Sequence, residues 1–351
     1  MKRSMVYDLR FTICESRNRR VPCLRSRKHV SPPGLRRATQ AWPWHPLLLA
    51  VLALGVIFTG GCRREKDKPA VALVMKSLAN EFFKTMEEGA KAHHEQHQGE
   101  YDLKVVGIKD ETDVTQQIQY VELMIAQKVD AIVIAPADSK ALVHVCKRAL
   151  DAGIIVVNID NKFDEAVLKA ENAKIPFVGP DNRKGAKLAG VYLASRLKAG
   201  DKVAVLEGAP NAYNGIQRKL GFEDAMLGSN IEIVSSQTGY WETDKAQPIA
   251  SAQINEHPDL KAILCANDSM ALGAVAALKD AGKLGSIHVV GFDNIAAVQR
   301  LLKEGRILCT VDQHADKLAL FGIEYALEML KTKAQLTDKE TPVDLITAEM
   351  L

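Results

Sequence analysis

Most of the strands predicted in this 351-residue chain are followed closely by a carboxylate, an amide or a cationic side chain. Three aromatic residues, Phe82, Phe83 and Trp241, stand among these polar positions. This mixture suits a sugar, because carboxylates and amides exchange hydrogen bonds with hydroxyls, arginine chelates two oxygens, and aromatic rings cover C–H faces. The polar candidates are Lys76, Asn80, Asp160, Asn161, Arg218, Asn267, Asp293 and Gln313.

Each of these positions also has an ordinary structural interpretation. An Asp or Asn directly before a helix most often caps that helix, and the Phe82-Phe83 pair could staple a helix to a sheet. A whole ring of polar side chains drawn from both halves of the chain exceeds what capping requires. The pattern therefore favours a binding site.

Enzymatic alternatives find little support in the sequence. The phosphate loop GxxxxGK[ST], a GxGxxG after a strand, the GxSxG elbow and HExxH are all missing. A catalytic pair made from Asp160 and Asp293 stays open, because the sequence does not give their separation. His93, His94 and His97 share a helix face but stand among Glu and Gln, so we expect an exposed face. We expect no enzyme, no cofactor and no metal.

The apolar pattern predicts strands that alternate with helices. Uninterrupted runs such as AIVI at 131–134 and IIVVNI at 154–159 are typical of parallel strands covered on both faces. Strands are expected from near 71, 103, 131, 154 and 176, then at 203–206, 231–235, 262–265, 287–291 and 307–311. Helices are expected near 80–97, 114–127, 138–151, 183–198, 216–227, 245–256, 269–281, 295–304 and 315–331.

This repeated rhythm predicts an α/β fold class with two doubly wound parallel-sheet (Rossmann-like) lobes and a cleft between them. Ligands of open parallel sheets bind at the carboxyl ends of the strands. The polar residues named above stand at those ends in both half-chains, so we expect them to converge on the cleft.

The charge of the chain is divided unevenly. Residues 1–61 hold 11 Lys and Arg against 2 Asp and Glu, a net of +9, and the remainder holds 35 against 41, a net of −6. A mildly acidic body lacks the basic face that nucleic-acid binding requires. We therefore expect no nucleic-acid partner.

An apolar run of 12 residues, Leu47 to Phe58, precedes Thr59-Gly60-Gly61-Cys62. The run is too short for a stable membrane-spanning helix and suits the core of a signal peptide. Small residues before a cysteine look like a lipobox, although Thr59 replaces the usual Leu. We expect a leader at 1–61 that is removed, lipidation of Cys62, and a charged tether at 62–69. The long basic start leaves two alternatives open, a start codon downstream or a twin-arginine signal at Arg36-Arg37.

The three later cysteines, Cys146, Cys265 and Cys309, lie in apolar segments, and their spacing matches no zinc pattern. We expect them to be small buried hydrophobic residues rather than reactive thiols.

Eight segments stand in this order along the chain: VALVMKSLANEFF, IVIAPADSKAL, VVNIDN, PFVGPDN, RKLGF, ILCANDSMALGA, VVGFDN and CTVDQ. As an ordered set they resemble the periplasmic sugar-binding proteins of ABC importers, above all the ribose- and allose-binding group. The resemblance runs from about Lys68 to Leu351 and implies a type I periplasmic binding protein with a multi-strand hinge near 180–182, 312–314 and 341–344. The implied lobes are 70–181 plus 314–341 and 182–313 plus 342–351.

The same resemblance implies a role for each candidate. Asn80 matches the first-lobe polar contact, Asp160 the carboxylate that accepts sugar hydroxyls, and Arg218 the bidentate arginine of the second lobe. Phe82 and Phe83 match the aromatic wall of the first lobe, and Trp241 matches the aromatic residue on the opposite face of the sugar ring. Asn267, Asp293 and Gln313 match the remaining polar contacts.

Three departures from the ribose-binding pattern bear on the ligand. Asn161 stands where ribose binders have Arg, Ala135 where they have Asn, and Lys76 where allose-type members have Lys. The expected ligand is therefore a monosaccharide, a hexose or a pentose of the allose or ribose kind.

The sequence as a whole predicts an exported, lipid-anchored monomer in the periplasm or cell envelope that delivers a sugar to an ABC permease. One alternative is a sensor that feeds a chemoreceptor or kinase. Another is a LacI-type effector-binding core, which would need a helix-turn-helix that residues 1–61 do not offer.

Overall fold

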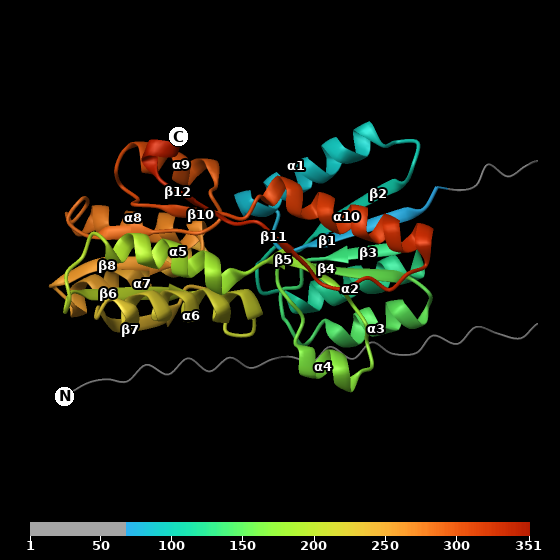
Figure 1. Ribbon diagram of the computed structural model, residues 1–351, viewed down its shortest axis with the longest axis horizontal. Coiled ribbons are helices and arrows are strands. Elements are labelled where there is room, and N and C mark those ends of the chain that lie inside the picture. Colours follow the sequence, from blue (N-terminus) through green and yellow to red (C-terminus); the bar gives the residue numbers. More distant parts are fainter. Residues whose placement is uncertain (1–67) are drawn as a thin grey trace, which may run out of the picture. The chain divides into compact units, whose positions relative to one another are not determined.

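The computed structural model describes residues 68–351, which form one compact unit with two parallel sheets. Figure 1 shows its helices and strands. The predicted leader, the lipidated Cys62 and most of the predicted tether lie outside the described residues. Among the helices that are described, none combines the length and apolar character needed to cross a membrane.

The first sheet has six parallel strands in the order β11-β5-β4-β3-β1-β2. Helices α1 and α10 cover one face and α2 and α3 the other (Figure 1). The strands are β1 (Ala70–Met75), β2 (Asp102–Gly107), β3 (Ala131–Ile134), β4 (Ile155–Ile159), β5 (Phe177–Pro180) and β11 (Lys339–Thr341). The helices are α1 (Glu81–Gln96), α2 (Val114–Ala126), α3 (Val143–Asp151), α4 (Glu165–Ala170) and α10 (Ala315–Thr332).

The second sheet has four parallel strands in the order β7-β6-β8-β9, and a separate antiparallel pair, β10 and β12, lies beside it. These strands are β6 (Lys202–Glu207), β7 (Glu232–Thr238), β8 (Leu260–Cys265), β9 (His288–Val290), β10 (Thr310–Asp312) and β12 (Asp344–Ile346). Its helices are α5 (Asn182–Ala194), α6 (Tyr213–Gly228), α7 (Thr243–Glu256), α8 (Asp268–Asp280) and α9 (Ala296–Lys303), with a 3-10 turn at Ala348–Met350.

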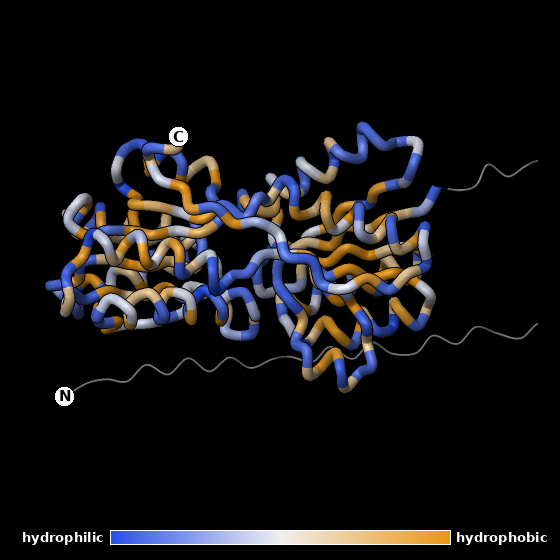
Figure 2. Tube along the Cα trace, in the orientation of Figure 1, coloured by the Kyte–Doolittle hydropathy of each residue, from blue (hydrophilic) through white to orange (hydrophobic). Residues whose placement is uncertain are grey.

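The uninterrupted apolar runs occupy strands that are buried on both faces. Along β1, Val71, Leu73 and Met75 pack into one apolar cluster, while Ala72 and Val74 pack into another on the opposite face. Side chains of a strand alternate between faces, so a strand covered by helices on both sides must be apolar at every position. Figure 2 shows these hydrophobic strands inside more polar helices. The predicted fold class, two Rossmann-like lobes, is confirmed.

The chain passes between the two sheets three times. It leaves β5 for α5 at Pro180–Asn182, returns from β10 to α10 at Asp312–Ala315, and leaves β11 for β12 at Thr341–Asp344. His314 takes a left-handed backbone conformation, with φ of 56°, at the second passage. Because three neighbouring connections join the two sheets, the sheets can move relative to each other mainly by bending at these segments.

Several short elements were not predicted. Helix α4 and strands β11 and β12 have six residues or fewer each, too short for a clear apolar period. The helix expected from 138 begins at Val143, because the Asp138 carboxylate instead accepts hydrogen bonds from the backbone N–H groups of Lys140 and Ala141 in a turn.

The three cysteines are buried and unpaired, as predicted, and burial raises the pKa of each thiol. The expected exposed histidine face is partly buried instead, since the His93 ring stacks on His97 and its Nδ1 lies 2.9 Å from the Tyr101 hydroxyl. Within residues 68–351 no cluster of His, Cys, Asp or Glu could hold a metal ion.

Close packing of α5 against α6 depends on Gly221. A Cβ there would lie 2.3 Å from the backbone oxygen of Arg183 and 2.8 Å from the Cβ of Ala186. We predict that Gly221→Ala lowers the free energy of unfolding by about 1–3 kcal/mol, because the helices must move apart. Gly228→Ala, at an open position of the same helix, is the control and should be neutral or slightly stabilising. Equal urea midpoints for the two variants would contradict this packing.

Asp268 gives the second lobe a pH-dependent stability. Its carboxylate accepts hydrogen bonds from the Thr310 hydroxyl (2.7 Å) and the Ile295 N–H (2.9 Å), and burial raises its pKa from 3.8 to about 7. The folded state therefore binds more protons than the unfolded state between pH 4 and 7. Stability from this group is complete below pH 4 and is lost toward pH 7, by up to about 1.4 kcal/mol per pH unit.

We predict that the difference in unfolding free energy, Asp268→Asn minus wild type, grows as pH rises from 4 to 7 and then levels off. Urea unfolding at each pH measures it, and Asp316→Asn, at an exposed position of α10, is the control. A difference that stays constant over this range would show that Asp268 does not titrate there.

Candidate functional site

A small cavity lies where the carboxyl ends of both parallel sheets face each other. The space inside it measures only about 10 Å³, about one water molecule, far below the roughly 300 Å³ at which pockets for drug-sized ligands begin. It is lined by Lys76, Asn80, Phe82, Phe83, Glu111, Asp160, Asn214, Arg218, Trp241, Asn267, Asp293 and Gln313. Of two larger hollows on the described surface, one shares none of these residues and the other shares only Asn80, Glu111 and Trp241.

The first lobe contributes a buried ion pair. Lys76 follows β1 directly, and its Nζ lies 3.1 Å from Oε2 of Glu111, in the loop after β2. The other Glu111 oxygen accepts a hydrogen bond from Nδ2 of Asn80 at 3.0 Å. Asn80 also caps α1, since its Oδ1 accepts from the Phe82 N–H. Asn80 is therefore both a helix cap and a cavity residue, because the oxygen of its amide accepts one hydrogen bond and the nitrogen donates the other.

Asp160 directly follows strand β4. It is buried in a left-handed conformation with φ of 60°, and its Oδ2 has no protein partner within the described chain. Burial raises the pKa of this carboxyl, while Lys76 and Arg218 act against the rise. The carboxylate is therefore held near two cations with one oxygen left to accept.

The second lobe fixes Arg218 from several sides. Its Nε donates to Oδ1 of Asn182 at 2.8 Å, its Nη1 donates to the Ala266 carbonyl at 2.9 Å, and its guanidinium lies 3.8 Å from the centre of the Phe292 ring. Nη1 also lies 3.5 Å from Oδ1 of Asp293. These contacts orient the arginine in one geometry and leave Nη2 without a protein partner in the described residues.

Asp293 and Gln313 complete the polar wall of the second lobe. The Gln313 Nε2 donates to Asp293 Oδ1 at 2.7 Å, which leaves Gln313 Oε1 without a partner in residues 68–351. Burial raises the pKa of Asp293 well above its ordinary value, and Arg218 opposes the rise. Asp293 has φ of 124°, an unusual conformation for a residue other than glycine.

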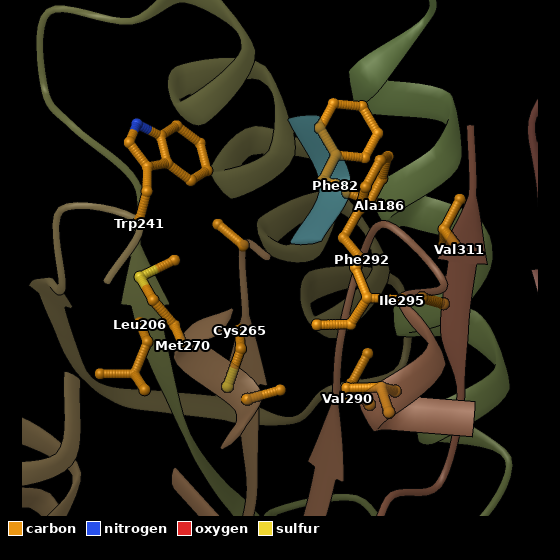
Figure 3. Close-up of a cluster of buried hydrophobic side chains, with 14 of the residues drawn as sticks. Phe82, Ala186, Leu206, Trp241, Cys265, Met270, Val290, Phe292, Ile295 and Val311 are labelled. Atoms are coloured by element: carbon orange, nitrogen blue, oxygen red, sulfur yellow. The ribbon is translucent and has the colours of Figure 1, made fainter. Parts of the chain in front are cut away.

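Aromatic rings bound the cavity on both sides. The Phe82 and Phe83 rings meet edge to face, 5.0 Å apart, at the start of α1. Trp241 reaches the cavity from the loop after β7, and Figure 3 shows it above Met270 and opposite Phe82 in one apolar cluster. Its backbone has φ of 71°, a strained value for a bulky residue.

Several contacts hold Trp241, among them those of Lys76 and Arg218, which lie 5.0 and 5.6 Å from its ring centre. The Asn267 Nδ2 donates to the Trp241 carbonyl at 3.2 Å, and Asn267 Oδ1 accepts from the Met270 N–H as the cap of α8. The ring lies against the backbone of Gly208, where a Cβ would approach it to 2.1 Å. The indole Nε1 is buried without a protein partner in the described part of the chain.

The sequence prediction and the lining of this cavity differ at Asn161. Its amide points away from the cavity, because Nδ2 donates to the Pro136 carbonyl at 2.8 Å and Oδ1 accepts from the Asn214 N–H at 3.1 Å. It is not among the residues that line the cavity. The other ten predicted residues all line the cavity.

Two lining residues, Glu111 and Asn214, were not predicted. Each lies in or just after the loop at the carboxyl end of a strand, β2 for Glu111 and β6 for Asn214. The strand-end rule that found the others could have found both, but each stands several residues after the end of its strand.

Four buried atoms define what the cavity can bind. Asp160 Oδ2 and Gln313 Oε1 accept hydrogen bonds, Arg218 Nη2 and Trp241 Nε1 donate them, and none has a partner in residues 68–351. A buried polar atom without a partner costs free energy, so the site is completed by a molecule that both donates and accepts. Hydroxyl groups do both.

Comparisons with known proteins show to which family the chain belongs. The family model of the periplasmic binding protein domain matches residues 71–334. The D-ribose/D-allose-binding protein of Pseudomonas aeruginosa is 58% identical over 286 residues, 80% of this chain and 90% of that protein.

Two solved structures are similar over nearly their whole length. An ABC transporter solute-binding protein from Burkholderia multivorans is 57% identical with a TM-score of 0.79, and the match covers 80% of this chain and 99% of that one. A periplasmic solute-binding protein from Actinobacillus succinogenes with bound D-allose is 35% identical with a TM-score of 0.77, over 81% and 99%. The predicted resemblance is thus confirmed, and the chain belongs to the periplasmic binding protein family, among the relatives of the ribose- and allose-binding proteins.

Proposed function

We propose that this protein captures a monosaccharide between its two lobes and delivers it to an ABC importer. The observation that supports this proposal most directly is the set of four partnerless atoms, two donors and two acceptors, in a small cavity bounded by aromatic rings. The relatives described above are named for sugar binding and for ABC transport. Ligand-binding roles follow for the lining residues Lys76, Asn80, Phe82, Phe83, Asp160, Arg218, Trp241, Asn267, Asp293 and Gln313.

The charges of the cavity favour a neutral ligand. Each of its two cations already has a carboxylate beside it, Glu111 for Lys76 and Asp293 for Arg218, and Asp160 adds a third carboxylate. A sugar phosphate or sugar acid would bring another anion to a site with no spare cation. An uncharged aldose makes hydrogen bonds without that repulsion.

An allose-like hexose fits better than ribose alone. Lys76 lines the cavity, where allose-type members of the family have Lys, and a relative of 35% identity is described with bound D-allose. Ala135 lies outside the lining residues and offers no amide. We therefore expect D-allose to bind at least as tightly as D-ribose.

We propose that the lobes, 70–181 plus 314–341 and 182–313 plus 342–351, close on the sugar as rigid bodies about the three passages between the sheets. The cavity takes residues from both lobes, so a bound sugar contacts both only in the closed form. Binding and closure are then thermodynamically linked. Export to the periplasm as a monomer anchored through lipidated Cys62 completes the proposal, and its leader and anchor lie outside the described residues.

We predict that the protein binds D-allose or D-ribose with micromolar or lower Kd, and that Asp160→Ala and Trp241→Ala each weaken binding at least tenfold. Each lost hydrogen bond to a charged group contributes about 1.5–3 kcal/mol. Isothermal titration calorimetry measures binding, with a panel of pentoses and hexoses.

Asp259→Ala, which removes only a surface ion pair with Lys202, is the control and should bind as wild type does. The unliganded melting temperature should stay nearly unchanged in all three variants. No binding of any sugar in the panel would refute the proposed function, and strong destabilisation without ligand would make Asp160 and Trp241 structural residues.

We predict that Gly208→Ala weakens sugar binding roughly five- to hundredfold, because its Cβ would lie 2.1 Å from the Trp241 ring and displace it. The Gly99→Ala variant has open space around the new Cβ and should bind normally. Calorimetry and the tryptophan emission spectrum test the two variants together. Equal affinities would mean that the position of the ring does not matter for binding.

A further inference from the structure

Helix α6 obtains its N-terminal hydrogen-bond acceptors from the opposite lobe. Its own N-cap residue is Ala212, which has no side-chain acceptor. The first two N–H groups of the helix instead donate across the cleft, from Tyr213 to Oγ of Ser139 at 2.9 Å and from Asn214 to Oδ1 of Asn161 at 3.1 Å. Ser139 and Asn161 follow β3 and β4 of the first sheet.

Neighbouring hydrogen bonds hold this arrangement in register. The Ser139 N–H donates to the Asn211 carbonyl at 3.0 Å, and Nδ2 of Asn211 donates to Asp138 at 2.6 Å. Asn161 is oriented by its bond to the Pro136 carbonyl, so that its oxygen faces α6. Ser139, Asn161 and the first turn of α6 thus form a connected set, which we call the interlobe cap.

The two acceptor residues of the interlobe cap are buried, unlike two other contacts between the lobes. Ser139 and Asn161 are 5% and 0% exposed. The bond from the Ala296 N–H to Glu81 and the ion pair of Lys245 with Asp110 lie at exposed positions, where such contacts contribute little.

We propose that Ser139 and Asn161 are positioning residues that raise sugar affinity by capping α6 only when the lobes are closed. The proposal rests on the proposed function and deepens it. When the lobes separate, the N–H groups of Tyr213 and Asn214 lose their acceptors, and Ala212 cannot replace them. The free energy of the cap therefore favours the closed form alone.

The cap also sets the position of the residues that line the cavity. Asn214 is itself a lining residue, and Arg218 lies about one turn further along the same helix. Neither Ser139 nor Asn161 lines the cavity. Loss of the cap should consequently weaken every sugar by the same factor, because no ligand group is involved.

The test compares Ser139→Ala with Ser195→Ala, whose hydroxyl donates only to Tyr192 of its own helix region. Calorimetry and stopped-flow kinetics are run with D-allose and D-ribose. We expect Ser139→Ala to weaken both sugars by the same factor, roughly 3- to 30-fold, mainly through faster dissociation. The unliganded melting temperature should match wild type, and Ser195→Ala should behave as wild type throughout.

Three results would overturn the interlobe cap. They are unchanged affinity in Ser139→Ala, a loss confined to one sugar, and a lower melting temperature without ligand. A second variant, Ala212→Ser, gives α6 an acceptor that the open form can use, so it should also weaken both sugars. If Ser139→Ala does not fold, Ala212→Ser is the deciding variant. Unchanged affinity of Ala212→Ser for both sugars refutes the interlobe cap.

If wild type binds neither sugar, the proposed function fails separately from the cap. Amide hydrogen exchange then judges the cap without ligand. In the open form Asn214 N–H has no acceptor in wild type but gains one in Ala212→Ser, so slower exchange at Asn214 in Ala212→Ser supports the cap and equal exchange refutes it.

Discussion

The need of buried polar atoms for hydrogen-bond partners governs this structure. Lys76, Glu111, Arg218 and Asp293 are removed from water, and each is stabilised by a neighbour of opposite charge in its own lobe. Asp160 Oδ2 and Trp241 Nε1 are left without a protein partner in the described residues. Each lobe thus holds its charged side chains in place, and the atoms that remain can pair with a molecule that carries hydroxyl groups.

The cavity residues are placed at some cost in backbone conformation. Asp160, Trp241 and Asp293 all have positive φ, and each follows the end of a strand. Such conformations are sparsely populated and persist where the surrounding structure determines them. The Gly208 backbone against the Trp241 ring is part of that surrounding structure. The site therefore depends on its supporting loops as much as on the residues that face the cavity.

Helix α6 links the cavity to the contact between the lobes. Gly221 lets it pack closely on α5, while Asn214 and Arg218 line the cavity from its first turns. Its N-terminus donates to Ser139 and Asn161 of the other lobe. Helix α6 therefore links the contacts with the ligand to the contacts between the lobes. Part of the affinity for the ligand then comes from contacts between the lobes.

The sequence by itself determined the fold class and most of the cavity. Continuous apolar runs require strands covered on both faces, and the residues that follow such strands must meet at one edge, which is why Lys76, Asp160 and Asp293 could be predicted. Only the tertiary structure decided the direction in which each side chain points. Glu111 pairs with Lys76 because β2 and β1 are neighbours, and Asn161 turns from the cavity because α6 of the other lobe offers an N–H group. Neither contact leaves a local pattern, because each joins residues far apart in the chain whose approach is set by how strands and lobes pack.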